Sequence, residues 1–272
     1  MKDKLLEKIK QLPPLPESAI KIEAIYQDPE SSFMDMVKVL ESDPLLTADI
    51  LKAANSPLYG FSREINSIER AVSLFGMGAI RGFALASIVK KSFKLDLSAY
   101  GITNDQFASL SQNQVALVNN WYAKIDRLML NVLSPASFLV EIGKALIAQI
   151  IIESGDKDAF KAMIVEGKIK EAEVEFIEID TAEASATIFD HWRFEDSLIS
   201  TIRYCSDPSK APDPETKTRS AILQAVRIAI PLNGVVTDES SAEAVACAKA
   251  NGLDDAALLD AINNMREVQD QD

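Results

Sequence analysis

Apolar residues recur along most of this chain at the spacing of an α-helix. Leu139, Ile142, Leu146 and Ile150 follow one another at intervals of three and four residues, which places them on one helical face. The same intervals recur within residues 198–205. Only 10 glycines and 11 prolines interrupt the chain, which favours long helices. The pattern predicts an all-α fold.

Capping residues mark where these helices begin. In Asp43-Pro44, the aspartate side-chain oxygen can accept a backbone N–H that has no partner within the helix. Proline suits the first helical position, because the N–H that it lacks would have no partner there. Ser134-Pro135 repeats this pattern, and Asp180 is a further cap. The signals together predict helices over about residues 17–27, 32–40, 43–54, 67–75, 79–92, 104–124, 134–150, 180–192, 198–205, 215–231, 240–251 and 254–268.

One segment carries a strand-like pattern. Residues 173–179 (EVEFIEI) alternate between polar and apolar positions over their first half. Within a chain of helices such a short stretch is more often a helix or a connector. No internal repeat, heptad array or low-complexity tract accompanies it.

Composition and charge narrow the class of protein. The chain has 272 residues, 47% apolar and 25% charged, which excludes collagen-like, disordered and membrane-spanning proteins. Lys and Arg number 28 against 41 Asp and Glu, a net charge of −13. A surface this acidic repels phosphate backbones and anionic lipids, so general binding of nucleic acid or of a membrane is disfavoured.

The N-terminal residues, the apolar runs and the cysteines indicate the cellular compartment of the protein. The N-terminal residues mix both charge signs and lack the apolar core of a signal peptide. The most apolar run, residues 146–152, is too short to cross a bilayer. Cys205 and Cys247 form neither a disulfide framework nor a zinc motif, and their helical positions suit small buried side chains. We expect a cytoplasmic protein.

Five ordered segments in the first hundred residues carry distinctive motifs: 12–16 (LPPLP), 41–47 (ESDPLLT), 51–60 (LKAANSPLYG), 65–72 (INSIERAV) and 74–81 (LFGMGAIR). They resemble the HDOD family, a divergent branch of the HD-domain metal phosphohydrolase superfamily associated with bacterial signalling. The resemblance is strong over residues 13–90. It continues more faintly over 134–208, where residues 138–144 (FLVEIGK) and Trp192 keep the pattern.

The resemblance implies a single unit over residues 1–272, with an N-terminal helical subdomain (1–125) and a degenerate HD-like bundle with C-terminal helices (126–272). The motif residues themselves are mainly architectural. Helix caps, helix stops and turns explain Asp43, Pro44, Asn55, Ser56 and Gly76. Arg81 is the cation within a family-like motif, and it either bridges helices through carbonyls or a carboxylate or faces a ligand.

The chemistry of the superfamily needs imidazoles that this chain lacks. HD-type hydrolysis uses a metal-activated water, held by a His-Asp dyad and further histidines. The resemblance puts that dyad at Val140-Glu141, a further histidine near Thr181, and a histidine pair at Tyr204-Cys205. His191 is the single histidine of the sequence, so no shift of alignment supplies the set. We interpret it as a surface residue at a helix end.

A metal site made of carboxylates alone is the main alternative. Mg²⁺ or Ca²⁺ accepts such ligands, and Glu141 and Asp180 are candidates, although 41 acidic residues make chance clusters common. No Walker-type phosphate loop and no Gly-x-Ser-x-Gly elbow is present. A serine or cysteine nucleophile would lack the usual histidine base.

The sequence therefore favours a non-catalytic regulatory module of signal transduction without a cofactor. It would bind a signalling protein partner or a small ligand, or act as a scaffold through its helical surfaces. A ligand would occupy the emptied metal cleft, which we expect to be lined by Val140, Glu141, Thr181, Tyr204 and Cys205. The alternative is a metal-dependent phosphohydrolase acting on a nucleotide through carboxylates.

Basic residues gather modestly at 90–91, 161–170 and 210–219. In so acidic a protein such clusters usually mark solvated helix faces. A groove for a nucleotide second messenger is the functional alternative, since phosphate recognition needs only a few well-placed cations.

Overall fold

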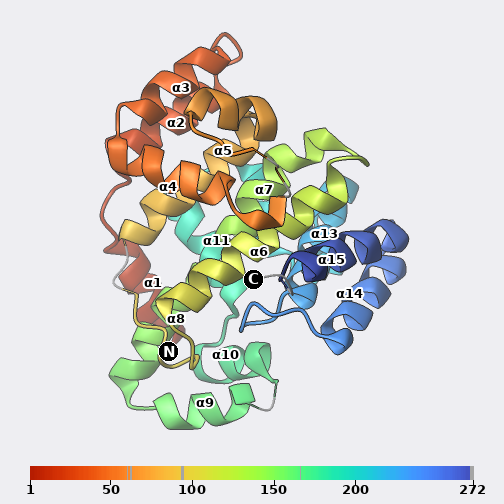
Figure 1. Ribbon diagram of the computed structural model, residues 1–272. Helices are drawn as coiled ribbons and strands as arrows, with labels where there is room; N and C mark the ends of the chain where they lie inside the picture. The colour runs from red at the N-terminus through yellow and green to blue at the C-terminus, as the bar shows by residue number, and fades with distance from the viewer. Residues whose placement is uncertain (60, 62, 93–94, 166, 270–272) are drawn as a thin grey trace.

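The computed structural model describes residues 1–59, 61, 63–92, 95–165 and 167–269, and the regular structure in these ranges is entirely helical (Figure 1). The prediction of an all-α fold is confirmed. The α-helices are α1 (Lys2–Lys10), α2 (Glu17–Gln27), α3 (Phe33–Glu41), α4 (Pro44–Ala54), α5 (Ile68–Ser92), α6 (Asn104–Tyr122), α7 (Leu130–Leu139), α8 (Gly143–Ser154), α9 (Lys157–Val165), α10 (Ile169–Ile177), α11 (Thr181–His191), α12 (Asp196–Arg203), α13 (Pro214–Ala229), α14 (Asp238–Ala250) and α15 (Asp255–Gln269).

The predicted caps begin their helices. Ser32 and its partner at the third helical position form a reciprocal capping box at the start of α3. The Asp43 carboxylate accepts the N–H groups of the two residues after Pro44 at the start of α4, each at 3.0 Å. Asp180 caps α11 in the same way at 2.9 Å. Side-chain acceptors thus set where these helices start.

Asn55 fixes the end of α4. Its amide nitrogen donates to the carbonyls of Leu51 at 2.9 Å and Ile65 at 2.8 Å, and its oxygen accepts the Ile65 N–H at 2.7 Å. The side chain thus holds the loop leading toward α5 against the end of α4. The Ser56 carbonyl accepts the Tyr59 N–H in the following turn. Gly60, which belongs to the same motif, lies outside the described residues.

Two glycines shape α5. Gly76 has φ +82° within the helix, which marks a kink where we expect a break between two helices. Gly82 lies against α7: a Cβ added there would come within 2.9 Å of the Pro135 Cα. The missing side chain lets α5 and α7 approach closely.

The expected helix start at Ser134-Pro135 is wrong. Both residues lie inside α7, which begins at Leu130 and ends at Leu139, and a separate helix, α8, begins at Gly143. Pro135 is the sixth of the ten residues of α7, where its missing N–H removes one backbone hydrogen bond of the helix. The predicted stripe from 139 to 150 therefore spans a turn at 140–142.

Residues 173–179 fall largely within α10, so the helical interpretation of this segment is confirmed. The capping and spacing patterns of the sequence do not predict two of the helices, α1 and α9. Both are short, and each places only one or two side chains in the core. Their helical state depends on packing against neighbours, because isolated helices of this length are marginal in water.

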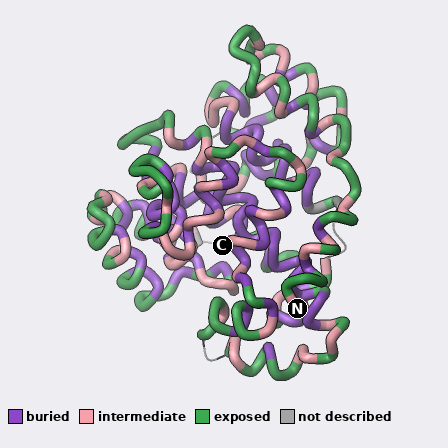
Figure 2. The backbone as a smooth tube through the Cα atoms, turned by 180° about the vertical axis from the view of Figure 1, so that it is seen from behind, coloured by how far each residue is buried: buried purple, intermediate pink, exposed green. Residues whose placement is uncertain are grey.

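Helix α7 lies at the centre of the fold (Figure 1) and packs against α5, α6, α12 and α13. Figure 2, seen from behind, shows buried residues concentrated in the middle of the molecule and exposed residues toward its outside. The first helix, α1, packs on α8 and α11, and the last, α15, packs on α6. The two predicted parts share this continuous core, and the division near residue 125 stays a prediction.

Arg81 ties the N-terminal helices to the start of α12. Its Nε and Nη2 donate to the two carboxylate oxygens of Glu23 in α2, at 2.6 and 2.8 Å. Its Nη1 lies 3.3 Å from the Glu195 carboxylate, and its guanidinium stacks 4.1 Å from the ring centre of Tyr26. The side chain is fully buried and bridges helices through carboxylates.

Two stretches, Ile68–Val89 and Leu130–Ser154, are long and apolar enough to cross a membrane by length and composition. Both are mostly buried inside the protein, and the second is broken by the turn before α8. Core helices of a globular fold carry the same signature, so this evidence for a membrane span is weak.

We expect Gly143→Ala to lower the free energy of unfolding by about 2 kcal/mol. A Cβ at this position would lie 2.7 Å from the Thr181 carbonyl oxygen and 2.8 Å from the Ser185 Oγ, so α8 and α11 would have to separate. Urea unfolding measures the loss. Gln149→Ala, on the exposed face of α8, is the control and should change stability by less than about 0.5 kcal/mol. Equal effects of the two substitutions would contradict the close approach.

Candidate functional site

The candidate site centres on a buried ion-pair cluster at the turn between α7 and α8. The Lys144 ammonium lies 3.1 Å from the Glu141 carboxylate and 3.1 Å from that of Glu173 in α10. It also donates to the Thr181 hydroxyl at 2.9 Å. All of these residues are at most 4% exposed. Charges this deep need partners, because desolvation is costly when it is not compensated.

Arg227, from α13, completes the charge balance. Its Nε donates to the Glu141 Oε1 at 2.7 Å, opposite Lys144 on the other carboxylate oxygen. Burial by itself raises the pKa of Glu141, but the charges of Arg227 and Lys144 outweigh it and hold that pKa well below its usual range. Glu141 is therefore an ionised carboxylate between two cations.

Glu173 is held by neutral donors as well. The Tyr100 hydroxyl donates to its Oε1 at 2.9 Å, and the Thr181 N–H donates to its Oε2 at 2.6 Å. Burial, and then the nearby Glu173 charge, raise the pKa of Tyr100 well above its ordinary value. Tyr100 therefore stays a hydrogen-bond donor across the physiological pH range.

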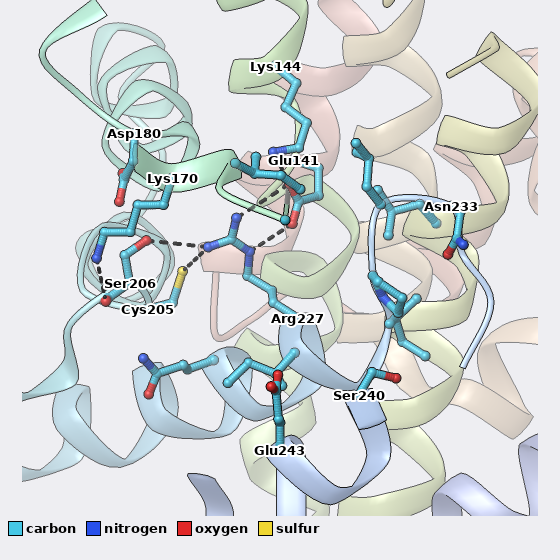
Figure 3. A pocket seen from close by; sticks show the side chains of 18 of the residues that line it. Glu141, Lys144, Lys170, Asp180, Cys205, Ser206, Arg227, Asn233, Ser240 and Glu243 are labelled. Carbon is cyan, nitrogen blue, oxygen red and sulfur yellow. Dashed lines mark hydrogen bonds and ion pairs between the residues drawn. The ribbon is translucent and has the colours of Figure 1, made fainter. Parts of the chain in front are cut away.

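A cavity of about 640 Å³ opens beside this cluster (Figure 3). Its wall is contributed by α6, α8, α10, α13, α14 and the loops between them. The volume lies within the usual range for small-ligand sites. Its polar and charged lining residues include Glu141, Lys144, Lys170, Glu173, Asp180, Cys205, Ser206, Arg227, Asn233, Ser240 and Glu243.

Two of the five residues expected in the cleft, Glu141 and Cys205, line this cavity. Val140, Thr181 and Tyr204 do not, which corrects that expectation. Val140 is fully buried and its carbonyl accepts a hydrogen bond from the Ser185 hydroxyl, while Thr181 is covered by its contacts with Lys144 and Glu173. Tyr204 ends α12 without reaching the cavity wall.

The two carboxylates considered as metal ligands, Glu141 and Asp180, bind other groups of the protein. Asp180 accepts the Glu183 N–H as the cap of α11, and Glu141 is bound to two cations. Within the described residues, no group of three or more His, Cys, Asp or Glu side chains could hold a metal ion. His191 is exposed at the last position of α11.

The two cysteines are not activated thiols. Burial raises the pKa of Cys205 to about 11, although the positive charge of Arg227 opposes this. Burial also raises the pKa of Cys247, which donates to Gln224 at 3.3 Å. Thiolates are the reactive form of cysteine, so Cys205 acts here as a small buried group and Cys247 as a half-buried one.

Lys144, Glu173 and Arg227 were not among the expected site residues. Lys144 stands at the end of the FLVEIGK segment, three positions after Glu141, so a helical i,i+3 pair was a readable signal. Glu173 and Arg227 are far away in sequence. Nothing in the residue order indicates that they meet Glu141 and Lys144.

Comparison with known families agrees with the resemblance drawn from the sequence. The family described as HDOD domain matches residues 12–208. The chain belongs to the HDOD domain family. HDOD domains are related to HD phosphohydrolases.

Three solved structures resemble this HDOD domain over nearly its whole length. A virulence factor from Campylobacter jejuni subsp. jejuni is 27% identical, with 98% of this chain and 96% of its own covered and a TM-score of 0.58. A proposed phosphohydrolase from Shewanella amazonensis SB2B is 21% identical, with 97% of each chain covered and a TM-score of 0.73. A proposed signal transduction protein from Marinobacter aquaeolei VT8 is 22% identical, with 97% of this chain and 59% of its own covered and a TM-score of 0.69.

A curated relative matches only part of this chain. An uncharacterized protein from Treponema pallidum (strain Nichols) is 26% identical over 77 residues, which are 28% of this chain and 15% of that relative. The match spans a small fraction of the relative's length. The likenesses to the Shewanella and Marinobacter structures show the fold.

Proposed function

We propose that this HDOD domain is a non-catalytic regulatory module of signal transduction that acts by binding a signalling protein or a small ligand. One observation carries the proposal: the Glu141 carboxylate, at the family-like position of the HD dyad, is bound on both oxygens by Lys144 and Arg227. Two fixed cations stand where a hydrolase would use the charge of this carboxylate to hold a metal ion.

A metal site would have to break this cluster. Divalent cations need carboxylates or imidazoles whose negative charge is available. If Glu141 left these two partners to bind a metal ion, Lys144 and Arg227 would lie next to a further positive charge. The three cations would repel one another strongly, because the protein interior screens charges poorly. The name of the Marinobacter neighbour, a proposed signal transduction protein, agrees with a regulatory role.

The metal content and the hydrolytic activity of the purified protein test this proposal. We expect no stoichiometric Mn²⁺, Mg²⁺, Fe or Zn by elemental analysis. With bis(4-nitrophenyl) phosphate and added Mn²⁺ or Mg²⁺, we expect turnover no faster than in a Glu141→Gln variant. Glu267→Gln, an exposed change of the same kind on α15, is the matched control.

The alternative function, a phosphohydrolase with a carboxylate-only metal site, predicts the opposite results. Stoichiometric metal together with turnover that Glu141→Gln abolishes and Glu267→Gln leaves intact would overturn our proposal. Thermal unfolding of both variants separates a lost activity from a lost fold.

A further inference from the structure

One wall of the cavity presents hydrogen-bond donors whose present contacts are mostly long. The Arg227 guanidinium makes one short bond, from Nε to the Glu141 Oε1 at 2.7 Å, and its Nη2 lies 3.5 Å from the Glu141 Oε2. Its Nη1 lies 3.4 Å from the Ser206 Oγ and 3.5 Å from the Cys205 Sγ. Lys170 donates to the Ser206 carbonyl at 3.0 Å and has further N–H groups. Figure 3 shows Lys170, Ser206 and Arg227 side by side. We call these three residues the donor wall.

The facing wall is acidic. Helix α14 contributes Glu239, Ser240 and Glu243 to the cavity lining, and both glutamates are exposed. In Figure 3, Ser240 and Glu243 approach the cavity from α14, across from Lys170. We call Glu239 and Glu243 the acidic wall. The lining also includes apolar side chains, among them Ile169, Ile228 and Leu232.

The charge of the cavity limits what it can hold. Three cationic side chains line it, Lys144, Lys170 and Arg227, against five carboxylates, Glu141, Glu173, Asp180, Glu239 and Glu243. Lys144 is committed to Glu141 and Glu173, and Arg227 is partly committed to Glu141. The donor wall therefore offers one anion-binding position in a cavity that is negative as a whole.

We infer that this cavity binds an elongated zwitterion: one carboxylate or phosphate monoester and one amine, joined by an apolar segment. The anionic group binds the donor wall through charge-assisted hydrogen bonds. The amine pairs with the acidic wall, and the hydrocarbon contacts the apolar residues of the lining. The inference rests on the proposed function, because it treats the site as one that binds without hydrolysis.

The same charges disfavour a nucleotide second messenger with several phosphates. A first phosphate would occupy the donor wall, and a second would face the carboxylates of the acidic wall. Like charges brought together at a partly buried site are repelled rather than bound. The cavity thus selects against a cyclic dinucleotide, the ligand class that the basic clusters of the sequence suggest.

Calorimetric titration of the full chain tests the inference with a matched set of probes. 6-Aminohexanoate and 6-aminohexyl phosphate carry both charges and distinguish a carboxylate from a phosphate as the anionic group. Hexanoate and hexylamine carry one charge each, and a cyclic dinucleotide represents the second messengers. We expect at least one zwitterion to bind at least about tenfold more tightly than either single-charge analogue, since each charge-assisted bond contributes about a factor of ten or more.

Two substitutions assign the ends of the ligand. Lys170→Gln should weaken the zwitterion and hexanoate but leave hexylamine unchanged, and Glu243→Gln should weaken the zwitterion and hexylamine but leave hexanoate unchanged. Lys249→Gln and Glu267→Gln make the same charge changes at exposed positions outside the cavity lining and should alter none of these affinities.

Three results would overturn the inference. They are an absence of binding by both zwitterions, equal binding by the single-charge analogues, and tighter binding by the cyclic dinucleotide. Each leaves the proposed function standing as long as the protein neither holds a metal nor hydrolyses phosphodiesters. The failure of the ligand class is therefore distinguishable from the failure of the regulatory role.

Discussion

Replacing Lys144 by methionine is expected to lower the free energy of unfolding by about 3–5 kcal/mol at pH 7. The ammonium is the charge shared by Glu141 and Glu173, at 3.1 Å from each. Both carboxylates are at most 5% exposed, so water cannot replace the lost partner. Methionine keeps the length and volume of the side chain, which confines the effect to charge and hydrogen bonds. Urea unfolding measures the loss.

The pH dependence of this loss follows from Glu141. Its pKa in the folded protein lies below the value of about 4.5 in the unfolded chain, so its ionised form stabilises the fold above pH 4.5. That stabilisation is lost as the pH falls toward the folded pKa. Methionine removes one of the two cations that lower this pKa, so the variant has less stability to lose. The difference between wild type and variant should therefore shrink from pH 7 to pH 3.

Two further variants separate this effect from a general loss of charge. Lys38→Met removes an exposed lysine from an i,i+3 pair with Asp35 on α3 and should cost less than about 1 kcal/mol. Adding Glu173→Gln to Lys144→Met should restore part of the stability, because one unpaired buried charge disappears with it. If Lys144→Met costs no more than Lys38→Met, the buried cluster does not contribute as the structure indicates.

The fold could be predicted from the sequence because its helix signals are local. Ser32, Asp43 and Asp180 begin helices through bonds to residues two or three positions away, and such bonds are visible in the residue order. The error at Ser134-Pro135 has the same origin. The cap-then-proline pattern is local too, but the packing of α7 beneath Gly82 of α5 places that pair inside a helix.

The candidate site could be predicted only in part, because it forms between segments far apart in the chain. The resemblance located Glu141, and Cys205 also lines the cavity. Glu173 and Arg227 lie 32 and 86 residues from Glu141 and belong to helices whose patterns show no function. The apolar spacing of α13 indicates which face is buried, but it gives no sign that an arginine on that helix pairs with a glutamate on another.

The lack of a histidine set for a metal and the presence of the two cations are parts of one arrangement. Glu141 is a buried carboxylate that needs positive charge. A divalent ion with a poor ligand set would supply that charge weakly, whereas Lys144 and Arg227 supply it from within the chain. The cluster thus joins the start of α8 to α10 and α13 through charges that the chain itself supplies.

Replacing Arg81 by methionine is expected to lower the free energy of unfolding by about 3 kcal/mol, the lower end for a broken buried pair. Arg81 is fully buried, but Glu23 and Glu195 are 13% and 23% exposed, so water compensates them in part. The loss should appear as a fall of roughly 6–12 °C in the midpoint of thermal unfolding. The N-terminal helices should also exchange amide hydrogens faster, because the tie between α2 and α12 is gone.

A double-mutant cycle shows whether Glu23 carries this effect. In the wild type, Glu23→Gln should be costly, because it leaves the Arg81 guanidinium with a poorer partner. In the Arg81→Met background the same change should cost little or restore stability, because the orphaned carboxylate is what destabilises that variant. Lys21→Met removes an exposed i,i+4 partner of Glu17 on the same helix and should change stability by less than about 0.5 kcal/mol. Additive effects of Arg81→Met and Glu23→Gln would mean that the guanidinium stabilises the fold through its packing on Tyr26 or its contact with Glu195 rather than through Glu23.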